Sequence, residues 1–206
     1  MNPPSLPDRI AAVQAGSLSA ADGLFRRFEP WLTVIARSQV ESRFAAKFDP
    51  SDLVQQTLAQ AVRDFPQFKG TTEPELLAWL RQILAHTLAH EIRRYAGTQK
   101  RDLDREVSLD QDLTAVSQRF GDLLPASGPT PSQNAVAADR QVQLARLLER
   151  LPPDYRDILV LRHLEGLSHD AIALRMNRKP GAVRMLWVRA LARLREEVTR
   201  EGQLPG

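Results

Sequence analysis

Apolar residues recur at intervals of three and four along most of the 206 residues, and this spacing suits packed helices and little else. No stretch shows the alternation of Val, Ile, Thr and aromatic residues that is typical of strands. The sequence therefore predicts an all-α protein. Two helical blocks flank a segment where the period fades and Pro, Ser and Gly collect, which indicates two small helical domains joined by a flexible linker.

The expected domain boundaries lie where the helical spacing of apolar residues begins and ends. We expect an N-terminal extension at 1–18, a first domain at 19–97, a linker at 98–138, a second domain at 139–200 and a C-terminal tail at 201–206. Residues 102–127 of the linker hold six acidic and two basic residues. Such a segment is either a solvated tether or an acidic strand that mimics nucleic acid or lies in a basic channel.

Capping residues and prolines predict where several helices begin. Asp49 can cap a helix whose first position is Pro50, and Pro30 is expected to open another helix with its preset φ. Thr72 and Glu75 form a capping box ahead of the longest expected helix, about 73–95, whose wide apolar face should make it central to the first domain.

Residues 167–197 carry the strongest local signal. Ser168 can cap a short helix, Asn177 tolerates a left-handed turn, and Pro180 starts a second helix. The pattern predicts a helix-turn-helix with a small shared core. Seven basic and no acidic residues lie between Arg175 and Arg195, which favours duplex DNA as the partner over a merely solvated helix face or a packing hairpin.

The long helix and its exit form a second basic stretch. Five basic residues stand against Glu91 alone between Leu76 and Arg101, and aromatic residues lie nearby. Cations that follow phosphates and rings that stack on bases suit unpaired nucleic acid. Phe68 and Trp79 are, however, typical core residues, so the residues alone leave both interpretations open.

Composition excludes several classes of protein. The chain has no cysteine, so disulfides, thiolate metal sites and cysteine nucleophiles are excluded, and a reducing compartment fits. No apolar run approaches the roughly 18 residues of a membrane span, and no signal peptide is visible, so we expect a cytoplasmic protein without membrane insertion. No phosphate-binding loop or nucleophile elbow is present, so we expect no enzyme and no cofactor.

Motifs in both blocks carry a family resemblance. They are Asp52-Leu53-Val54-Gln55, Phe65 and Phe68 with Gly70, and Glu91-Ile92-Arg93-Arg94 in the first block, and Leu151-Pro152, Glu165-Gly166-Leu167-Ser168 and Val183-Arg184 in the second. The chain resembles a sigma-70 family RNA polymerase sigma factor of the extracytoplasmic-function (ECF) type over about residues 20–96 and 139–199. The resemblance implies a protein that binds core polymerase, directs it to specific promoters and helps melt the −10 element.

The resemblance also implies site residues. Core polymerase binding, through the β′ clamp helices, falls to Asp49, Asp52, Leu53, Val54, Gln55 and Gln56. Contacts to −10 DNA fall to Phe68, Lys69, Trp79, Arg81, Gln82, His86, His90, Arg93 and Arg94. Contacts to −35 DNA fall to Arg178, Lys179, Gly181, Arg184, Met185, Val188 and Arg189. Further implied partners are the polymerase β flap and an anti-sigma protein.

The sequence departs from the family's pattern on both DNA-facing helices. His86 and His90 stand where Asn and Asp are usual, and Lys179 stands where a Ser would cap the second helix of the helix-turn-helix. Leu186 and Val188 occupy positions that are usually polar. The resemblance therefore implies no particular promoter sequence.

Two other functions compete with a sigma factor. His86 and His90, four residues apart on one helix face, could bind a metal ion, but no third ligand is evident, so we expect no metal site. The alternative of a dimeric helix-turn-helix regulator that acts without core polymerase uses residues 168–197 but leaves Asp52 and the long basic helix without a role.

Overall fold

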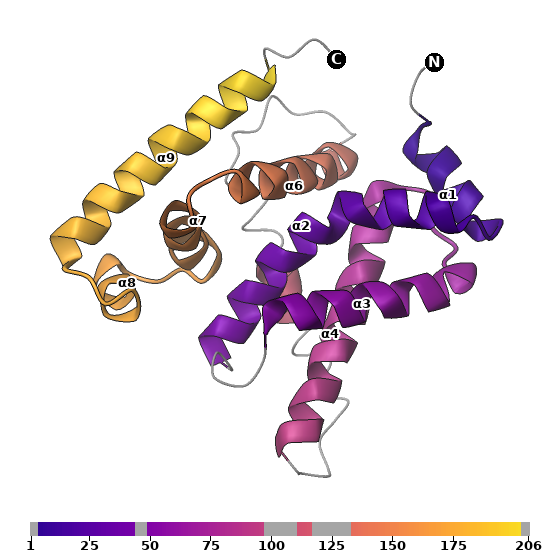
Figure 1. Ribbon diagram of the computed structural model, residues 1–206, viewed down its shortest axis with the longest axis horizontal. Coiled ribbons are helices and arrows are strands. Elements are labelled where there is room, and N and C mark those ends of the chain that lie inside the picture. Colours follow the sequence, from indigo (N-terminus) through magenta and orange to yellow (C-terminus); the bar gives the residue numbers. More distant parts are fainter. Residues whose placement is uncertain (1–3, 44–48, 97–110, 117–132, 203–206) are drawn as a thin grey trace.

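The computed structural model describes residues 4–43, 49–96, 111–116 and 133–202 (Figure 1). All regular structure in these residues is helical, which confirms the all-α prediction. The amino-terminal half consists of α1 (Leu6–Gln14), α2 (Leu18–Arg43), α3 (Pro50–Asp64), the 3₁₀ turn η1 (Phe65–Gln67) and α4 (Glu73–Ala96). The carboxyl-terminal half consists of α6 (Gln133–Glu149), α7 (Pro153–Leu159), the π-helical turn η2 (Val160–Leu164), α8 (His169–Arg175) and α9 (Pro180–Gly202).

Helix starts in the amino-terminal half are capped largely as the sequence predicts. Asp49 accepts a hydrogen bond from the backbone N–H of Ser51 and caps α3. At the start of α4 the Glu75 carboxylate accepts bonds from the backbone N–H groups of Thr71 and Thr72 and from the Thr72 hydroxyl. These bonds hold the pKa of Glu75 below its usual range. These caps fix where α3 and α4 begin.

The prediction that Pro30 opens a helix was wrong. Pro30 lies inside α2, which begins at Leu18 and continues to Arg43. A proline in a helix interior removes one hydrogen bond, but Phe28, Trp31 and Leu32 are buried on the same helix. Burial of these large side chains offsets the missing bond and keeps α2 continuous.

The expected linker lies mostly outside the described residues. Within it, residues 111–116 are helical, with Leu113 and Val116 buried. The helix α6 begins at Gln133, ahead of the boundary expected at 139. Residues 6–14 of the expected N-terminal extension form α1, which buries Ile10 and Val13 next to α2 and η1.

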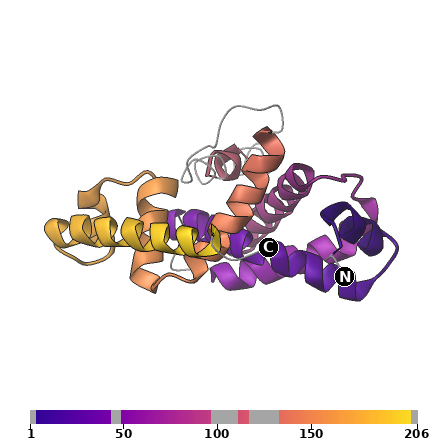
Figure 2. The ribbon, with the colours of Figure 1, turned by 90° about the horizontal axis from the view of Figure 1, so that it is seen from above.

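The helix α6 connects the two halves. It packs on α2 and α4, while its other neighbours include α9, and its buried residues include Val142, Leu144 and Leu148. Figure 2 shows α6 crossing over the amino-terminal helices while α9 extends away from them. The described buried side chains form one continuous apolar cluster from Ile10 to Leu194.

Candidate nucleic-acid interface

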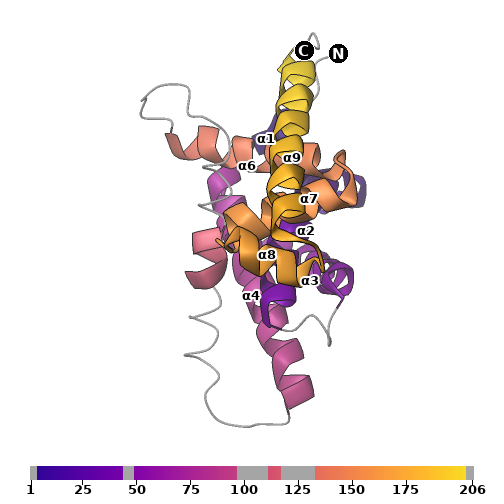
Figure 3. The same cartoon turned by 90° about the vertical axis from the view of Figure 1, so that its left-hand side faces the viewer.

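The pair α8 and α9 forms the expected helix-turn-helix. Ser168 accepts a hydrogen bond from the backbone N–H of Ala171 and caps α8. Asn177 has a φ of 50°, in the left-handed region, and so turns the chain sharply before α9. Figure 3 shows α8 crossing α9 near the start of α9. This arrangement leaves one side of α9 facing away from the rest of the protein.

The helix α9 has a buried and an exposed side. Val183, Ala190 and Leu194 are buried against the neighbouring helices. Arg184, Met185, Val188 and Arg189 are exposed, as are Lys179 and Gly181 at the start of the helix. The structure thus gathers these predicted −35 contacts on one region of the surface.

Trp187 holds α9 in place through two histidines. Its indole N–H donates to His163 Nε2 at 3.2 Å, and the His169 ring lies edge-on to it at 5.5 Å between centroids. Burial, and to a smaller degree the Arg162 guanidinium, lowers the pKa of His163. The neutral imidazole that burial favours is the form that accepts the indole N–H. These contacts were not visible in the sequence.

The basic run divides into cations that are paired within the protein and cations that are not. Arg175 pairs with Glu165, Arg178 with Asp154, and Arg193 with Glu196 and Glu197. Arg184 and Arg189 form no ion pair or hydrogen bond with another described side chain, and both are exposed. The charge on the outward side of α9 is therefore available to an anion that approaches from solution.

Predicted −10 contacts form a stripe along α4. Gln82, His86, His90 and Arg94 follow at intervals of four residues and are all exposed, while the half-buried Arg81 and Arg93 lie beside them. His90 and Arg94 both lie 3.7 Å from the carboxylate of the buried Glu91. In the described part of the chain no three metal-ligating side chains come together, so the structure adds no third ligand to His86 and His90.

Phe68 and Trp79 lie in a cluster of aromatic side chains. The Phe68 ring centroid is 4.9 Å from that of Trp79 and 5.4 Å from that of Phe65, and Phe68 is only 6% exposed. Trp79 is half-buried, and Lys69 is exposed in the adjoining loop. The Phe68 ring is thus a packing group in this structure.

The residues expected to bind core polymerase lie on α3 or at its cap, and they divide into exposed and buried side chains. Asp49, Asp52, Gln55 and Gln56 are exposed, whereas Leu53 and Val54 are buried. Gln55 donates to the Glu29 carboxylate of α2 at 3.0 Å. Leu53 and Val54 therefore position the helix, and the polar residues present its outer side.

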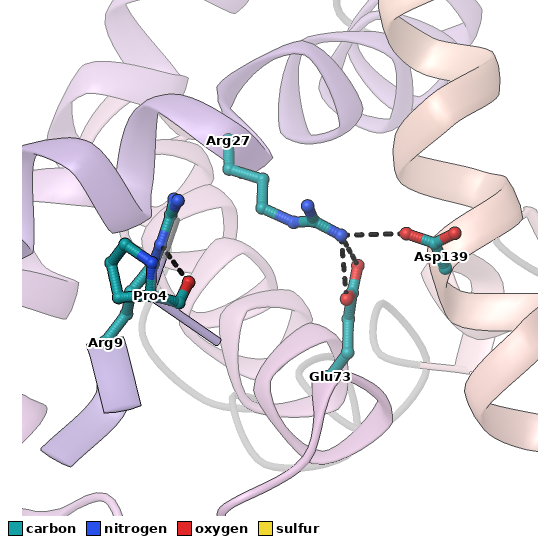
Figure 4. A network of polar contacts seen from close by, with 5 residues as sticks. All are labelled: Pro4, Arg9, Arg27, Glu73 and Asp139. Atoms are coloured by element: carbon teal, nitrogen blue, oxygen red, sulfur yellow. Dashed lines mark hydrogen bonds and ion pairs between the residues drawn. The ribbon is translucent and has the colours of Figure 1, made fainter. Parts of the chain in front are cut away.

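A polar network that the sequence did not predict joins the two halves (Figure 4). Arg27 Nη2 of α2 donates to both oxygens of Glu73 on α4, at 2.9 and 3.0 Å, and to Asp139 of α6 at 2.8 Å. Burial raises the pKa of Glu73, and Arg27 offsets only part of that effect. Close by, the Trp31 indole N–H donates to Gln141 Oε1 of α6 at 3.1 Å.

Comparison with known proteins shows what kind of chain carries this surface. The family described as "Sigma-70, region 4" matches residues 141–194, from α6 into α9. The ECF RNA polymerase sigma factor SigD of Mycobacterium tuberculosis is 28% identical over 193 residues, which are 94% of this chain and 84% of SigD. The ECF RNA polymerase sigma-E factor of Salmonella typhimurium is 29% identical over 184 residues, which are 88% of this chain and 87% of that protein.

The chain belongs to the ECF type of the sigma-70 family. In this ECF sigma-70 protein the matched region includes α8, the turn and α9 as far as Leu194, and the alignments with its relatives extend through the amino-terminal helices as well. In the part that the structure describes, no helix is both long and apolar enough to cross a bilayer.

Proposed function

We propose that this ECF sigma-70 protein binds core RNA polymerase, directs it to promoters and helps separate the strands at the −10 element. The observation that carries the proposal is the outward side of α9, which presents Arg184 and Arg189 without an acidic residue between Gly181 and Arg195. Its relatives, named as RNA polymerase sigma factors, align over nearly all of the chain, which supports the same conclusion.

In this proposal three surfaces of the protein bind different partners. The exposed side of α9 binds the −35 element in the major groove. The stripe of Gln82, His86, His90 and Arg94 on α4 follows the −10 strand. Lys69 and Trp79 come before the amino-terminal end of this stripe in the sequence. Asp52, Gln55 and Gln56 on α3 face core polymerase. We further propose the β′ clamp helices and the β flap as the polymerase contacts, and an anti-sigma protein as a regulator.

Strand opening then depends on binding free energy. Unpairing and flipping a base costs a few kcal/mol, and stacking on a protein ring returns about 1–3 kcal/mol per base. Cations along α4 add contacts to the phosphates of the separated strand. The protein acts as a DNA-binding partner of an enzyme, in the cytoplasm where that enzyme works, and its own residues need no catalytic chemistry.

We propose the same working units as the sequence predicts, a polymerase-binding and −10 unit at 19–97 and a −35 unit at 139–200, although α6 already begins at Gln133. A linker between them allows both to engage one promoter. The network at Arg27 adds that the second unit begins on a helix, α6, that packs on the first.

Transcription from a promoter library tests the proposal. Core polymerase mixed with the purified chain is expected to start transcripts at defined sites, and core polymerase alone is not. The chain is also expected to elute together with core polymerase. A chain that leaves start sites unselected on every template would overturn the proposed function.

Two substitutions separate the proposed surfaces. Arg184→Ala removes an unpaired cation from α9 and is expected to weaken promoter binding roughly tenfold while core binding is unchanged. Asp52→Ala on α3 is expected to weaken core binding and leave the affinity of the assembled holoenzyme for DNA unchanged. Gel-filtration binding and filter-binding titrations measure the two quantities, and an equal loss of both in either variant would contradict the division.

A dimeric regulator that acts without polymerase gives a different result. It would bind a symmetric duplex tightly by itself and would ignore core polymerase. The alignment of the relatives with α2, α3 and α4 does not favour it, because such a regulator has no use for those surfaces.

A further inference from the structure

The outward side of α9 has an apolar centre. Gly181, Met185, Val188 and Ala192 follow at intervals of four, three and four residues and are all exposed. At about 100° per residue they fall within about 60° of one another around the helix axis. They lie opposite Val183, Ala190 and Leu194, which are buried. We call these four residues the central stripe.

Cations border the central stripe on both sides. By the same helical geometry Arg184 lies along one edge and Arg189 along the other. Neither forms an ion pair with another described side chain, in contrast to Arg175, Arg178 and Arg193. A partner that fits this surface therefore has anionic rims and an apolar group between them.

The major groove of DNA offers that arrangement. Phosphates line both of its walls, and the C5-methyl group of thymine is the apolar group on its floor. Met185 and Val188, which are 54% and 51% exposed, carry no side-chain N–H or O–H and so cannot read a base edge through conventional hydrogen bonds. Their exposed carbons gain most where they cover another apolar group.

Gly181 supports close approach at the start of the stripe. A Cβ added there would meet no other atom of the protein within 4 Å, so packing inside the chain does not require a glycine at this position. The missing side chain leaves the backbone of the first turn open to contact with a base pair.

We propose that Met185 and Val188 read thymine methyl groups in the −35 element, while Arg184 and Arg189 hold the phosphates on the two walls of the groove. This inference rests on the proposed function. It assigns base discrimination to aliphatic contacts and assigns to the arginines a part that does not depend on sequence. The −35 elements of this protein then contain thymine at the positions below the central stripe.

The test replaces thymine with deoxyuridine, which pairs in the same way but has no methyl group. Holoenzyme made from the full chain and core polymerase first selects −35 elements from a random duplex library. Each thymine of a selected element is then exchanged singly for deoxyuridine. At one or two positions the exchange is expected to weaken binding about fourfold, the effect of one buried methyl group.

Variants assign the effect to side chains. Val188→Ala and Met185→Ala are each expected to abolish the difference between thymine and deoxyuridine at one position. Val198→Ala, the same change on the same helix but off the central stripe, is expected to leave every difference unchanged. Arg184→Ala should weaken binding to both duplexes by the same factor and lower the salt dependence by about one phosphate contact.

Three results would overturn the inference while the proposed function stands. They are equal binding of thymine and deoxyuridine duplexes by a holoenzyme that selects start sites, a methyl effect that persists in both variants, and loss of core binding in place of DNA discrimination, which would make the stripe a protein contact. Failure to select start sites on either kind of template is a different outcome, which removes the proposed function itself.

Discussion

His163 holds α9 through a bond that depends on its protonation state. Its Nε2 accepts the Trp187 indole N–H, so a proton on that atom removes the bond. Burial lowers the pKa of His163 in the folded protein below the usual 6.5. Between the folded and the unfolded pKa the unfolded chain binds more protons, and stability therefore falls as pH falls below about 6.5.

This behaviour predicts a pH effect that can be removed at one residue. The wild-type free energy of unfolding should drop between pH about 7.5 and about 5.5, and His163→Gln should drop less, because an amide oxygen can accept the indole N–H without titrating. Urea titrations at both pH values measure this. Parallel curves for the two proteins would contradict the role of His163.

Single residues differ in how far the sequence reveals them. The left-handed turn at Asn177 and the cap at Ser168 were predictable because each depends on atoms within a few positions. The pairing of Arg178 with Asp154 spans 24 residues and depends on how α7 packs, so the sequence could not separate paired from unpaired arginines. The sequence leaves both burial and base stacking open for Phe68 for the same reason.

At the scale of elements, the junction between η1 and α4 depends on Gly70. A Cβ at that position would lie 2.5 Å from Phe68 Cζ and 2.9 Å from Glu75 Cβ. Gly70→Ala should therefore destabilise the protein by about 1–3 kcal/mol through overpacking of the aromatic cluster. Urea unfolding measures the change.

Gly23 in α2 provides a matched control. A Cβ there meets nothing within 4 Å, so Gly23→Ala should stabilise the helix by about 0.5–1 kcal/mol. Destabilisation of similar size in both variants would contradict the steric argument for Gly70.

The start of a helix is predictable from the sequence where it depends on adjacent residues. The starts of α3, α4 and α8 follow from residues adjacent to them, and all were expected. The continuity of α2 through Pro30 was not, because it results from burial of the residues around the proline by other helices. The π-helical turn η2 after α7 cannot be told from plain α-helix in the sequence, since nothing in its apolar pattern distinguishes the two.

At the scale of the whole molecule, Arg27 ties three helices together. Its side chain is 26% exposed and that of Glu73 is 11% exposed. Arg27→Ala leaves a largely buried carboxylate without its cation and should cost about 1–3 kcal/mol of unfolding free energy. Arg26→Ala removes the ion pair between Arg26 and Asp22, whose side chains are 75% and 64% exposed. This substitution should lower the free energy of unfolding by less than about 0.5 kcal/mol.

Chemical unfolding of both variants measures this difference. Equal stabilities would show that the network contributes nothing to the joining of α2, α4 and α6. The sequence could not have predicted the network, because Arg27 lies 46 residues from Glu73 and 112 from Asp139. Local pattern determines where most of the helices begin, whereas contacts over such distances depend on the assembled core.

The position of α6 has a consequence for an extended form of the protein. Trp31 is fully buried, and its indole N–H is satisfied by Gln141 of α6. If promoter binding draws the two halves apart, the indole N–H of Trp31 loses its acceptor on α6. Separation of the halves therefore carries the cost of leaving this donor unsatisfied until water or another acceptor reaches it.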